Sequence, residues 1–308
     1  MSRRRAEPPG AAGFLVVDKP RGWTSHDVVD AARRWLGTRR VGHLGTLDPL
    51  ATGVLPLAVR EATKLVPFLA DAAKAYTGEI ELGAETDTLD AEGRVLRRSS
   101  GELPSEARLR DALAGFVGEI EQVPPMFSAV KLGGVPLHRM AREGREVPRA
   151  AKKVRIDALT LLAYEPPRAR IEVLCSTGTY VRSLAADVGT RLGCGAFLAS
   201  LRRTRSGPFR SEDAAPVEEL EALARAGQLE ARLIPPVNVL GLPVVRLEAP
   251  DERRVRNGND VTLAGVALPP EGRVAGVGPG GDLGAVLEIR PGRRLQPLRV
   301  LHSLAGSG

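Results

Sequence analysis

The 308-residue sequence has few cysteines, few aromatic residues and no long apolar segment. Its two cysteines, Cys175 and Cys194, form no CxxC pair and no zinc-site spacing. This argues against a zinc domain, and we interpret both as small buried residues of a reducing cytosol. No apolar run is long enough to span a membrane, and no apolar segment of a signal peptide follows the basic residues 1–5. We therefore expect a cytoplasmic protein without a membrane partner.

Acidic residues are outnumbered by basic ones. Lys and Arg number 44 against 37 Asp and Glu, which gives a formal net charge of +7. An excess of positive charge favours a polyanionic partner such as RNA or DNA, although a general preference for arginine would give the same balance. Aromatic residues make up only 4% of the chain, so each of them is a candidate for a specific role.

Periodicity and turn residues predict a mixed α/β fold. Strands are expected at 13–18, 54–59, 76–82, 94–96, 154–164 and 170–175, with 94–96 paired to 76–82 across a polar loop. Helices are expected at 26–36 (capped by Ser25), 61–69, 105–116, 137–143, 180–192 and 217–226.

The composition divides the chain into three parts. Residues 1–12 are rich in Arg, Pro and Gly and are expected to be a disordered basic tail. Residues 13–240 carry the mixed α/β pattern. Residues 241–308 have short apolar runs, many glycines and no long helical pattern, which predicts a small β-barrel-like domain.

One carboxylate lies in an unusual loop. Residues 42–55 read GHLGTLDPLATGVL, so that glycines, a proline and two threonines surround Asp48. Glycine permits a close approach of the backbone to a ligand, and Pro49 keeps Asp48 extended. Such an aspartate is usually a turn residue, and the loop alone does not establish catalysis.

Further segments give this loop its meaning. Residues 18–22 read DKPRG and are followed by Ser25. Residues 74–76 read KAY, 83–90 GAETDTLD, 123–131 VPPMFSAVK, 175–182 CSTGTYVR and 192–196 LGCGA. In this order, over residues 13–210, they resemble the TruB-type tRNA pseudouridine-55 synthases. A fainter similarity to a PUA-type RNA-binding domain follows.

The resemblance implies a fold and an activity. The fold would be a pseudouridine synthase domain with a mainly antiparallel sheet at 13–240, an RNA-gripping insertion at about 127–150, and a PUA-like domain at 241–308. The activity would be isomerisation of the uridine at position 55 in the tRNA T loop. The glycosidic bond of a flipped-out base is broken and the base is rejoined through C5. No atoms are gained, so no cofactor or metal is expected.

The resemblance also implies roles for particular residues. Asp48 would be the catalytic carboxylate, as nucleophile or as base, with Arg182 as the partner that keeps it ionised. Tyr76 would stack on the flipped uracil. The remaining pocket residues would be His43, filling the space that the base leaves, Lys19 and Pro20, supporting the pocket, Tyr180, packing beside Arg182, and Leu201, forming an apolar wall.

A basic surface is expected to bind the T stem-loop. It would comprise 128–149, with Lys131, His138, Arg139, Arg142 and Arg145, together with Arg202, Arg203 and Arg205. Two positions depart from the family pattern, Leu44 in place of Thr and His138 in place of Tyr. They bear on RNA fit and not on the reaction.

Three alternatives remain open at this stage. The chain could be a related synthase that works in a guide-RNA complex, although the insertion favours a stand-alone enzyme, expected to be a monomer without an obligatory protein partner. It could be an RNA-binding or RNA-folding protein in which Asp48 is idle. It could be a metal hydrolase using His26, His43, Asp18 and Asp48, although these lack compact metal-ligand spacing.

Overall fold

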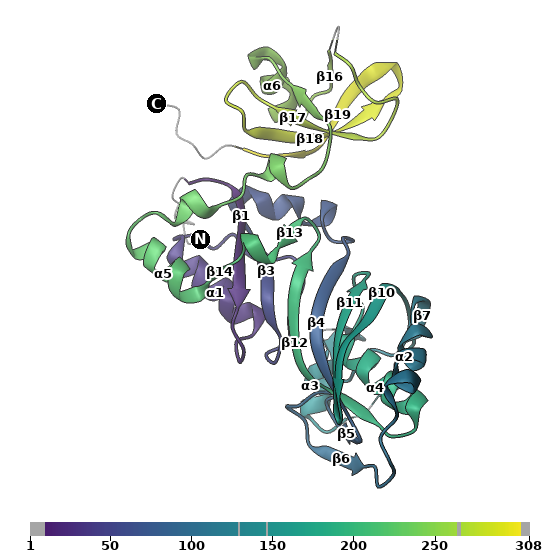
Figure 1. Cartoon of the computed structure of the whole chain (residues 1–308). Coiled ribbons are helices and arrows are strands. Elements are labelled where there is room, and N and C mark those ends of the chain that lie inside the picture. Colours follow the sequence, from purple (N-terminus) through teal and green to yellow (C-terminus); the bar gives the residue numbers. More distant parts are fainter. Residues whose placement is uncertain (1–9, 129, 146, 264–265, 303–308) are drawn as a thin grey trace.

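The computed structural model describes residues 10–128, 130–145, 147–263 and 266–302. A ten-stranded sheet crosses the large domain, and a five-stranded sheet forms a smaller domain at the C-terminal end (Figure 1). The strands of the large sheet are β1 (Gly13–Lys19), β2 (Val41–His43), β3 (Thr52–Val59), β4 (Lys74–Leu82), β7 (Gly118–Gln122), β10 (Lys152–Glu165), β11 (Arg168–Cys175), β12 (Ala196–Ser206), β13 (Phe209–Arg210) and β14 (Ala215–Pro216).

The main path through the large sheet is β14-β1-β3-β12-β4-β11-β10-β7, with β2 beside β3 and β13 beside β12. Its pairs are antiparallel except for β1 with β14 and β3 with β12. The prediction of a mixed α/β domain with a mainly antiparallel sheet is therefore confirmed.

Helices and short hairpins complete the large domain (Figure 1). The α-helices are α1 (Ser25–Trp35), α2 (Glu106–Ala114), α3 (Leu137–Arg142), α4 (Val181–Leu192) and α5 (Val217–Arg225). The 3-10 segments are η1 (Arg60–Phe68), η2 (Ser211–Asp213), η3 (Leu229–Arg232) and η4 (Pro236–Asn238), and the hairpins are β5 (Ala84–Thr86) with β6 (Val95–Arg98) and β8 (Lys131–Leu132) with β9 (Val135–Pro136).

Alternation along the central strands builds the main core. In β4, Tyr76, Gly78 and Ile80 are buried, and Thr77 and Glu79 between them are half-buried. Ile171 and Val173 are buried on one face of β11. The side chains of α2 and α4 pack into this core through Leu109, Leu184 and Val188. The period of two fixes which face is buried, and so which residues of β4 can reach the pocket described below.

Several local predictions were wrong. The helix expected at 61–69 is a 3-10 segment that contains Pro67, which cannot donate an intrahelical hydrogen bond. β6 pairs with β5 and not with β4, because Gly83 turns the chain away at the end of β4. The cap of α1 is Thr24, which shares a capping box with Asp27.

The longest omission is β12, an 11-residue strand at the centre of the sheet. Its second half, LRRTRS, contains three arginines and does not alternate, and two register shifts interrupt its pairing with β4. A prediction based on hydrophobicity depends on regular alternation of apolar and polar residues, so it does not detect this strand.

The C-terminal unit is a small, mainly β domain, as expected. Its sheet order is β15-β17-β18-β19-β16. The elements are β15 (Val244–Arg246), α6 (Ala249–Arg256), β16 (Val261–Thr262), β17 (Arg273–Val277), β18 (Leu283–Arg290), η5 (Pro291–Arg293) and β19 (Arg294–Val300). The strand β19 and the helix α6 were not predicted.

The two domains share a packed interface. One apolar cluster contains Phe14 and Val54 of the large domain together with Leu283, Val286 and Leu301 of the C-terminal unit. Polar contacts reinforce it: the backbone N–H of His302 donates to the Glu61 carboxylate, and Lys64 donates to the carbonyl of Val300 at 3.0 Å. The C-terminal unit thus packs against η1 and against the face of β1 and β3 that carries Phe14 and Val54.

None of the helices in the described part of the chain has both the length and the apolar character that a membrane crossing needs.

Candidate active site

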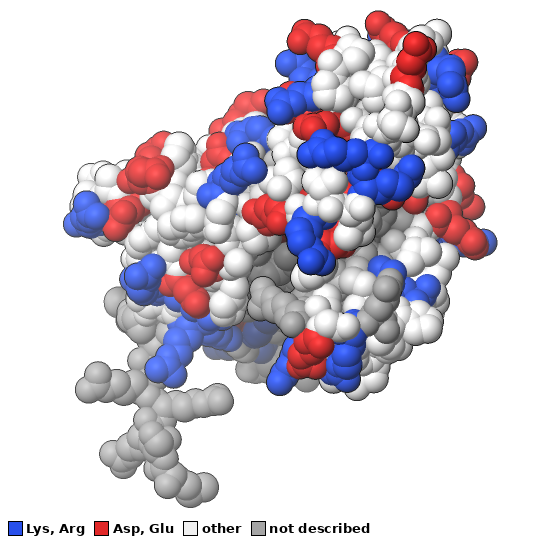
Figure 2. Space-filling view, turned by 90° about the horizontal axis from the view of Figure 1, so that it is seen from below, with Lys and Arg blue, Asp and Glu red and all other residues white. Residues whose placement is uncertain are grey.

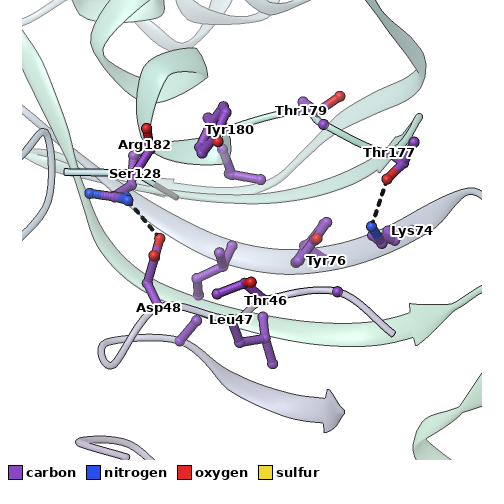
Figure 3. A pocket seen from close by; sticks show the side chains of 15 residues that line it. Thr46, Leu47, Asp48, Lys74, Tyr76, Ser128, Thr177, Thr179, Tyr180 and Arg182 are labelled. Carbon is purple, nitrogen blue, oxygen red and sulfur yellow. Dashed lines mark hydrogen bonds and ion pairs between the residues drawn. The ribbon is translucent and has the colours of Figure 1, made fainter. Parts of the chain in front are cut away.

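Asp48 lies in the loop between β2 and β3 and faces a pocket of about 250 Å³. Its carboxylate forms an ion pair with Arg182 of α4, with 2.8 Å between Oδ2 and Nη2 (Figure 3). The residues lining the pocket come from five segments and comprise Gly45, Thr46, Leu47, Asp48, Ala51, Lys74, Tyr76, Ser128, Thr177, Gly178, Thr179, Tyr180, Val181, Arg182 and Leu201.

Arg182 connects three parts of the chain. It is 5% exposed, and Nη1 also pairs with the buried carboxylate of Asp90 at 3.3 Å. The remaining donors on Nη1 and Nη2 go to the carbonyls of Thr88 and Phe127 at 3.1 and 2.9 Å. A guanidinium held by two carboxylates and two carbonyls has a fixed orientation toward Asp48.

The surroundings of Asp48 perturb its ionisation. Removal from water raises the pKa of the carboxyl above its ordinary value, the charge of Arg182 opposes this, and the negative charge of Asp90 adds to the increase. The side chain nevertheless stays 39% exposed toward the pocket. Arg182 therefore favours a carboxylate that is ionised and accessible, as a nucleophile or base requires.

Tyr76 and Leu201 form apolar walls of the pocket. Tyr76 lies opposite Arg203 in the β4–β12 register. Burial raises the pKa of the Tyr76 phenol above its ordinary value, although the positive charge of Arg203 opposes this shift. A phenol in this state offers a stacking face and is a poor base at neutral pH.

Three side chains anchor the Asp48 loop from behind. The hydroxyl of Ser25 accepts from the Leu47 N–H at 2.7 Å and donates to the Leu47 carbonyl. The ammonium of Lys19 donates to the Trp23 and Pro20 carbonyls at 2.6 and 2.9 Å, and to the Pro49 carbonyl at 3.4 Å. Burial lowers the Lys19 pKa to about 8, although the charge of Asp48 opposes this shift.

Arg203 is the third anchor, and its expected role on the RNA surface was wrong. The side chain is fully buried and donates to the carbonyls of Val54, Gly45 and Thr46, at 2.7, 3.1 and 3.4 Å. It therefore joins the two ends of the loop that carries Asp48. The backbone of β12 passes so close that a Cβ on Gly53, which has a φ of +98°, would lie 2.2 Å from the Arg203 carbonyl oxygen.

The other residues expected near the pocket have varied positions. Tyr180 precedes α4 and is held by Gln122, whose amide oxygen accepts from its N–H at 2.7 Å. The Pro20 carbonyl accepts from Lys19, as a supporting residue would.

His43 is half-buried, its Nδ1 accepts from the Gly45 N–H at 3.3 Å, and it does not line the pocket. Burial lowers its pKa, which favours the neutral imidazole.

The residues expected to bind RNA differ in their exposure to solvent, and several of them form contacts within the protein. Arg202 is 41% exposed and forms two hydrogen bonds with the carboxylate of Asp18, at 2.9 and 2.7 Å. Arg139 and Arg145 are exposed and pair with Glu143, and the Arg205 guanidinium donates to the Gly207 carbonyl. The side chains of Lys131, His138 and Arg142 lie outside the described residues. On the face shown in Figure 2, basic and acidic side chains are interspersed.

The site corresponds to a known enzyme family. Residues 33–181 match the N-terminal domain of the TruB family of pseudouridylate synthases, and residues 182–240 match the C-terminal domain of tRNA pseudouridylate synthase B. The chain belongs to the TruB family. It is therefore a pseudouridine synthase, as the order of its motifs implied.

Individual TruB relatives cover nearly the whole chain. A tRNA pseudouridine synthase B of Xanthomonas campestris is 43% identical over 95% of this chain and 94% of its own length. One from Geobacter sulfurreducens is 47% identical over 80% of this chain and 81% of its own. A solved H/ACA RNP bound to a substrate RNA contains a chain with 25% identity and a TM-score of 0.71, covering 95% of this chain and 86% of that one.

The side chains of the metal-hydrolase alternative have separate partners. Asp18 pairs with Arg202, His26 with Asp30, Asp48 with Arg182, and His43 with the Gly45 N–H. Within the described ranges, no three His, Cys, Asp or Glu side chains gather as metal ligands would.

Sequence reasoning missed several residues of the site. Asp90 and Lys74 lie within the segments 83–90 and 74–76, but no role was predicted for them. Ser25 was predicted to cap α1, whereas its hydroxyl binds the backbone of Leu47. The short polar residues of 175–182, a Gly and two Thr before α4, were the available signal that this segment lines a pocket.

Proposed function

We propose that this TruB enzyme converts the uridine at position 55 in the T loop of tRNA to pseudouridine, with Asp48 as the catalytic group. Its relatives bear the name tRNA pseudouridine synthase B, which supports a tRNA substrate. The observation that carries the assignment of Asp48 is its position. It is a pocket carboxylate held at 2.8 Å by a buried arginine that other residues fix in place.

The pocket suits a nucleotide that has left its helix. A uracil buried inside folded RNA cannot reach Asp48 unless it flips out, at a cost of a few kcal/mol. Stacking on Tyr76 and contact with Leu201 offset part of this cost, because base–aromatic stacking contributes about 1–3 kcal/mol. Asp48 then acts at the sugar, by attacking carbon or by removing a sugar proton, and the freed base rejoins through C5.

Binding of the tRNA is assigned to the surface around the pocket. The insertion at about 127–150 and the exposed Arg202 would contact phosphates, and the domain at 241–308 would act as a PUA-like RNA-binding unit. The reaction gains and loses no atoms, so we propose that it proceeds without a metal or cofactor, and also without an obligatory protein partner. The enzyme is proposed to work as a monomer, unlike a synthase that depends on a guide-RNA complex.

The test uses purified full-length protein and unmodified tRNA, without added metal or cofactor. We expect pseudouridine at position 55, and we expect Asp48→Asn to abolish it while tRNA affinity stays within a few-fold, because chemistry and phosphate contacts are separate contributions. Asp30→Asn, an exposed position of α1, is the matched control. Product from a clean Asp48→Asn sample would move the catalytic role elsewhere. Tight binding without product from the unaltered protein would favour an RNA-folding function.

A further inference from the structure

Lys74 brings a second cation, besides Arg182, into the pocket that contains Asp48. It is the first residue of β4, two positions before Tyr76, and its Nζ donates to the Thr177 hydroxyl at 3.0 Å. Its ammonium lies over Gly45, where the φ of +132° suits glycine and an added Cβ would lie 3.2 Å from Nζ. The catalytic loop therefore leaves space for this ammonium.

The charge of Lys74 is not neutralised. Among the residues that the structure describes, no carboxylate forms an ion pair with it, and the charged side chain that acts most strongly on it is the buried cation Arg203. Burial and Arg203 both lower the pKa of the ammonium below that of an exposed lysine. A partly buried cation without a counterion at the wall of a substrate pocket suits an anionic or strongly polar ligand group.

The position of Lys74 indicates which part of the substrate it meets. In Figure 3, Asp48 and Arg182 lie at one end of the pocket, Lys74 and Thr177 lie at the other, and Tyr76 lies between them. A nucleotide with its sugar carbon C1′ at Asp48 and its base on Tyr76 extends the far edge of the uracil toward Lys74. That edge carries carbonyl oxygens, which accept hydrogen bonds.

We propose that Lys74 is a catalytic residue that stabilises the uracil as it departs. When the C1′–N1 bond breaks, the electron pair remains on N1 and the negative charge spreads over the ring to O2 and O4. The Nζ–H of Lys74 donates to one of these oxygens, with Thr177 holding the ammonium in place. When C5 forms the new bond to C1′, the negative charge returns to Asp48, which either leaves C1′ as a carboxylate or gives its proton back to the sugar. C5 then loses its proton and N1 gains one.

This role rests on the proposed function but is independent of how Asp48 acts. Attack on C1′ and removal of a sugar proton both expel the base with its electron pair. In both routes a fixed donor is stronger toward the departing anion than toward the neutral base, and only such a difference accelerates the step.

The test combines Lys74→Met with a change in the leaving group. Substrate tRNA carries uridine or 5-fluorouridine at the target position, and fluorine stabilises the uracil anion without help from the protein. Single-turnover consumption of uridine by Lys74→Met should fall by about 100-fold, the usual cost of losing a fixed donor to a developing anion. The loss on 5-fluorouridine should be about tenfold smaller, and Lys74→Arg should recover part of the rate on uridine.

Binding measurements separate this role from a phosphate contact. We expect Lys74→Met and the exposed control Lys153→Met to bind tRNA alike, with the same dependence of affinity on salt. A salt slope that falls by about 0.7–0.9 for Lys74→Met would identify a phosphate contact and overturn the inference. Equal losses on uridine and 5-fluorouridine in a folded variant would also overturn it. If the unaltered enzyme consumes no uridine, the proposed function itself fails.

Discussion

At the scale of single residues, the site is a row of alternating charges. Arg182 lies between the carboxylates of Asp48 and Asp90, at 2.8 and 3.3 Å. The Asp48 carboxylate is accessible from the pocket, whereas the Asp90 carboxylate is buried. One carboxylate is thus available to the substrate, and the other holds the arginine that keeps the first one ionised.

The role of Asp90 can be measured through the pH dependence of Asp48. The proposed role of Asp48 needs the ionised carboxylate, so we expect the rate to fall as pH decreases through the Asp48 pKa, which lies above its ordinary value. Asp90→Asn removes a negative charge that raises this pKa, so the acidic limb should move to lower pH. The maximal rate should fall by about 10²-fold at most, since Arg182 loses an anchor. Single-turnover rates over a pH series decide, and an acidic limb at an unchanged or higher pH would contradict the expectation.

Tyr76 can be tested for two separate tasks. Burial raises the pKa of its phenol, so the hydroxyl stays protonated at neutral pH and its removal of the C5 proton is unfavourable. We expect Tyr76→Phe to keep most of the single-turnover rate and Tyr76→Leu to lose it, because only the second change removes the stacking face. A Phe variant as inactive as the Leu variant would assign proton transfer to the hydroxyl.

The residues of the site differ in how well the sequence predicted them. The motifs brought Asp48, Tyr76, Arg182 and Leu201 into one pocket, and the structure lines its pocket with all four. Arg203 was placed on the surface because its neighbours in LRRTRS are basic. Its burial depends on carbonyls 149 to 158 positions away in the chain, which no local pattern reveals.

At the scale of elements, the strand β12 holds the loop that carries Asp48, because its Arg203 binds carbonyls at both ends of that loop. Two neighbouring arginines of this strand have different positions, although the sequence analysis assigned both to the RNA-binding surface. Arg203 points into the protein and binds loop carbonyls, whereas Arg202 is half-exposed and pairs with Asp18. Successive side chains of a strand point to opposite faces, which places Arg203 inside the protein and Arg202 at its surface.

Methionine substitutions at these two positions form a matched pair. Arg203→Met should lower the free energy of unfolding by about 1–3 kcal/mol, because buried carbonyls lose their donor, and should reduce the rate at saturating tRNA. Arg202→Met should cost about 1 kcal/mol or less and should weaken tRNA binding instead. Chemical denaturation and tRNA titration distinguish the variants. Weaker binding by Arg203→Met with an intact rate would return this residue to the RNA surface.

Elements with regular patterns were the easiest to predict. The strands at β4, β10 and β11 and the helices α2, α4 and α5 appear where periodicity and caps indicated them. The strands β12 and β19 were missed because basic and polar residues interrupt their apolar pattern. Their strand conformation comes from tertiary pairing with β4 and β18.

At the scale of the whole molecule, the two domains share part of their packing. Leu301 and Val286 are buried against the cluster that includes Phe14 and Val54, and Val54 lies at the end of the catalytic loop anchored by Arg203. The composition shift near residue 240 predicted a modular boundary, but composition does not reveal that apolar contacts cross it. Deletion of 241–308 would expose buried apolar surface of the large domain, so a truncated protein is a poor test of modularity.

Unfolding of the full chain provides a better test of how tightly the domains are coupled. Both tryptophans, Trp23 and Trp35, lie in the large domain, so their fluorescence reports on that domain alone. Leu295 is buried in a cluster made only of C-terminal residues, and Leu295→Ala should cost about 2–5 kcal/mol there. If the shared interface makes unfolding one cooperative transition, this distant change will shift the tryptophan midpoint to lower denaturant. Leu301→Ala, at the interface itself, should shift it similarly. A tryptophan midpoint unchanged by Leu295→Ala, with a separate earlier transition in circular dichroism, would instead mean that the domains unfold independently.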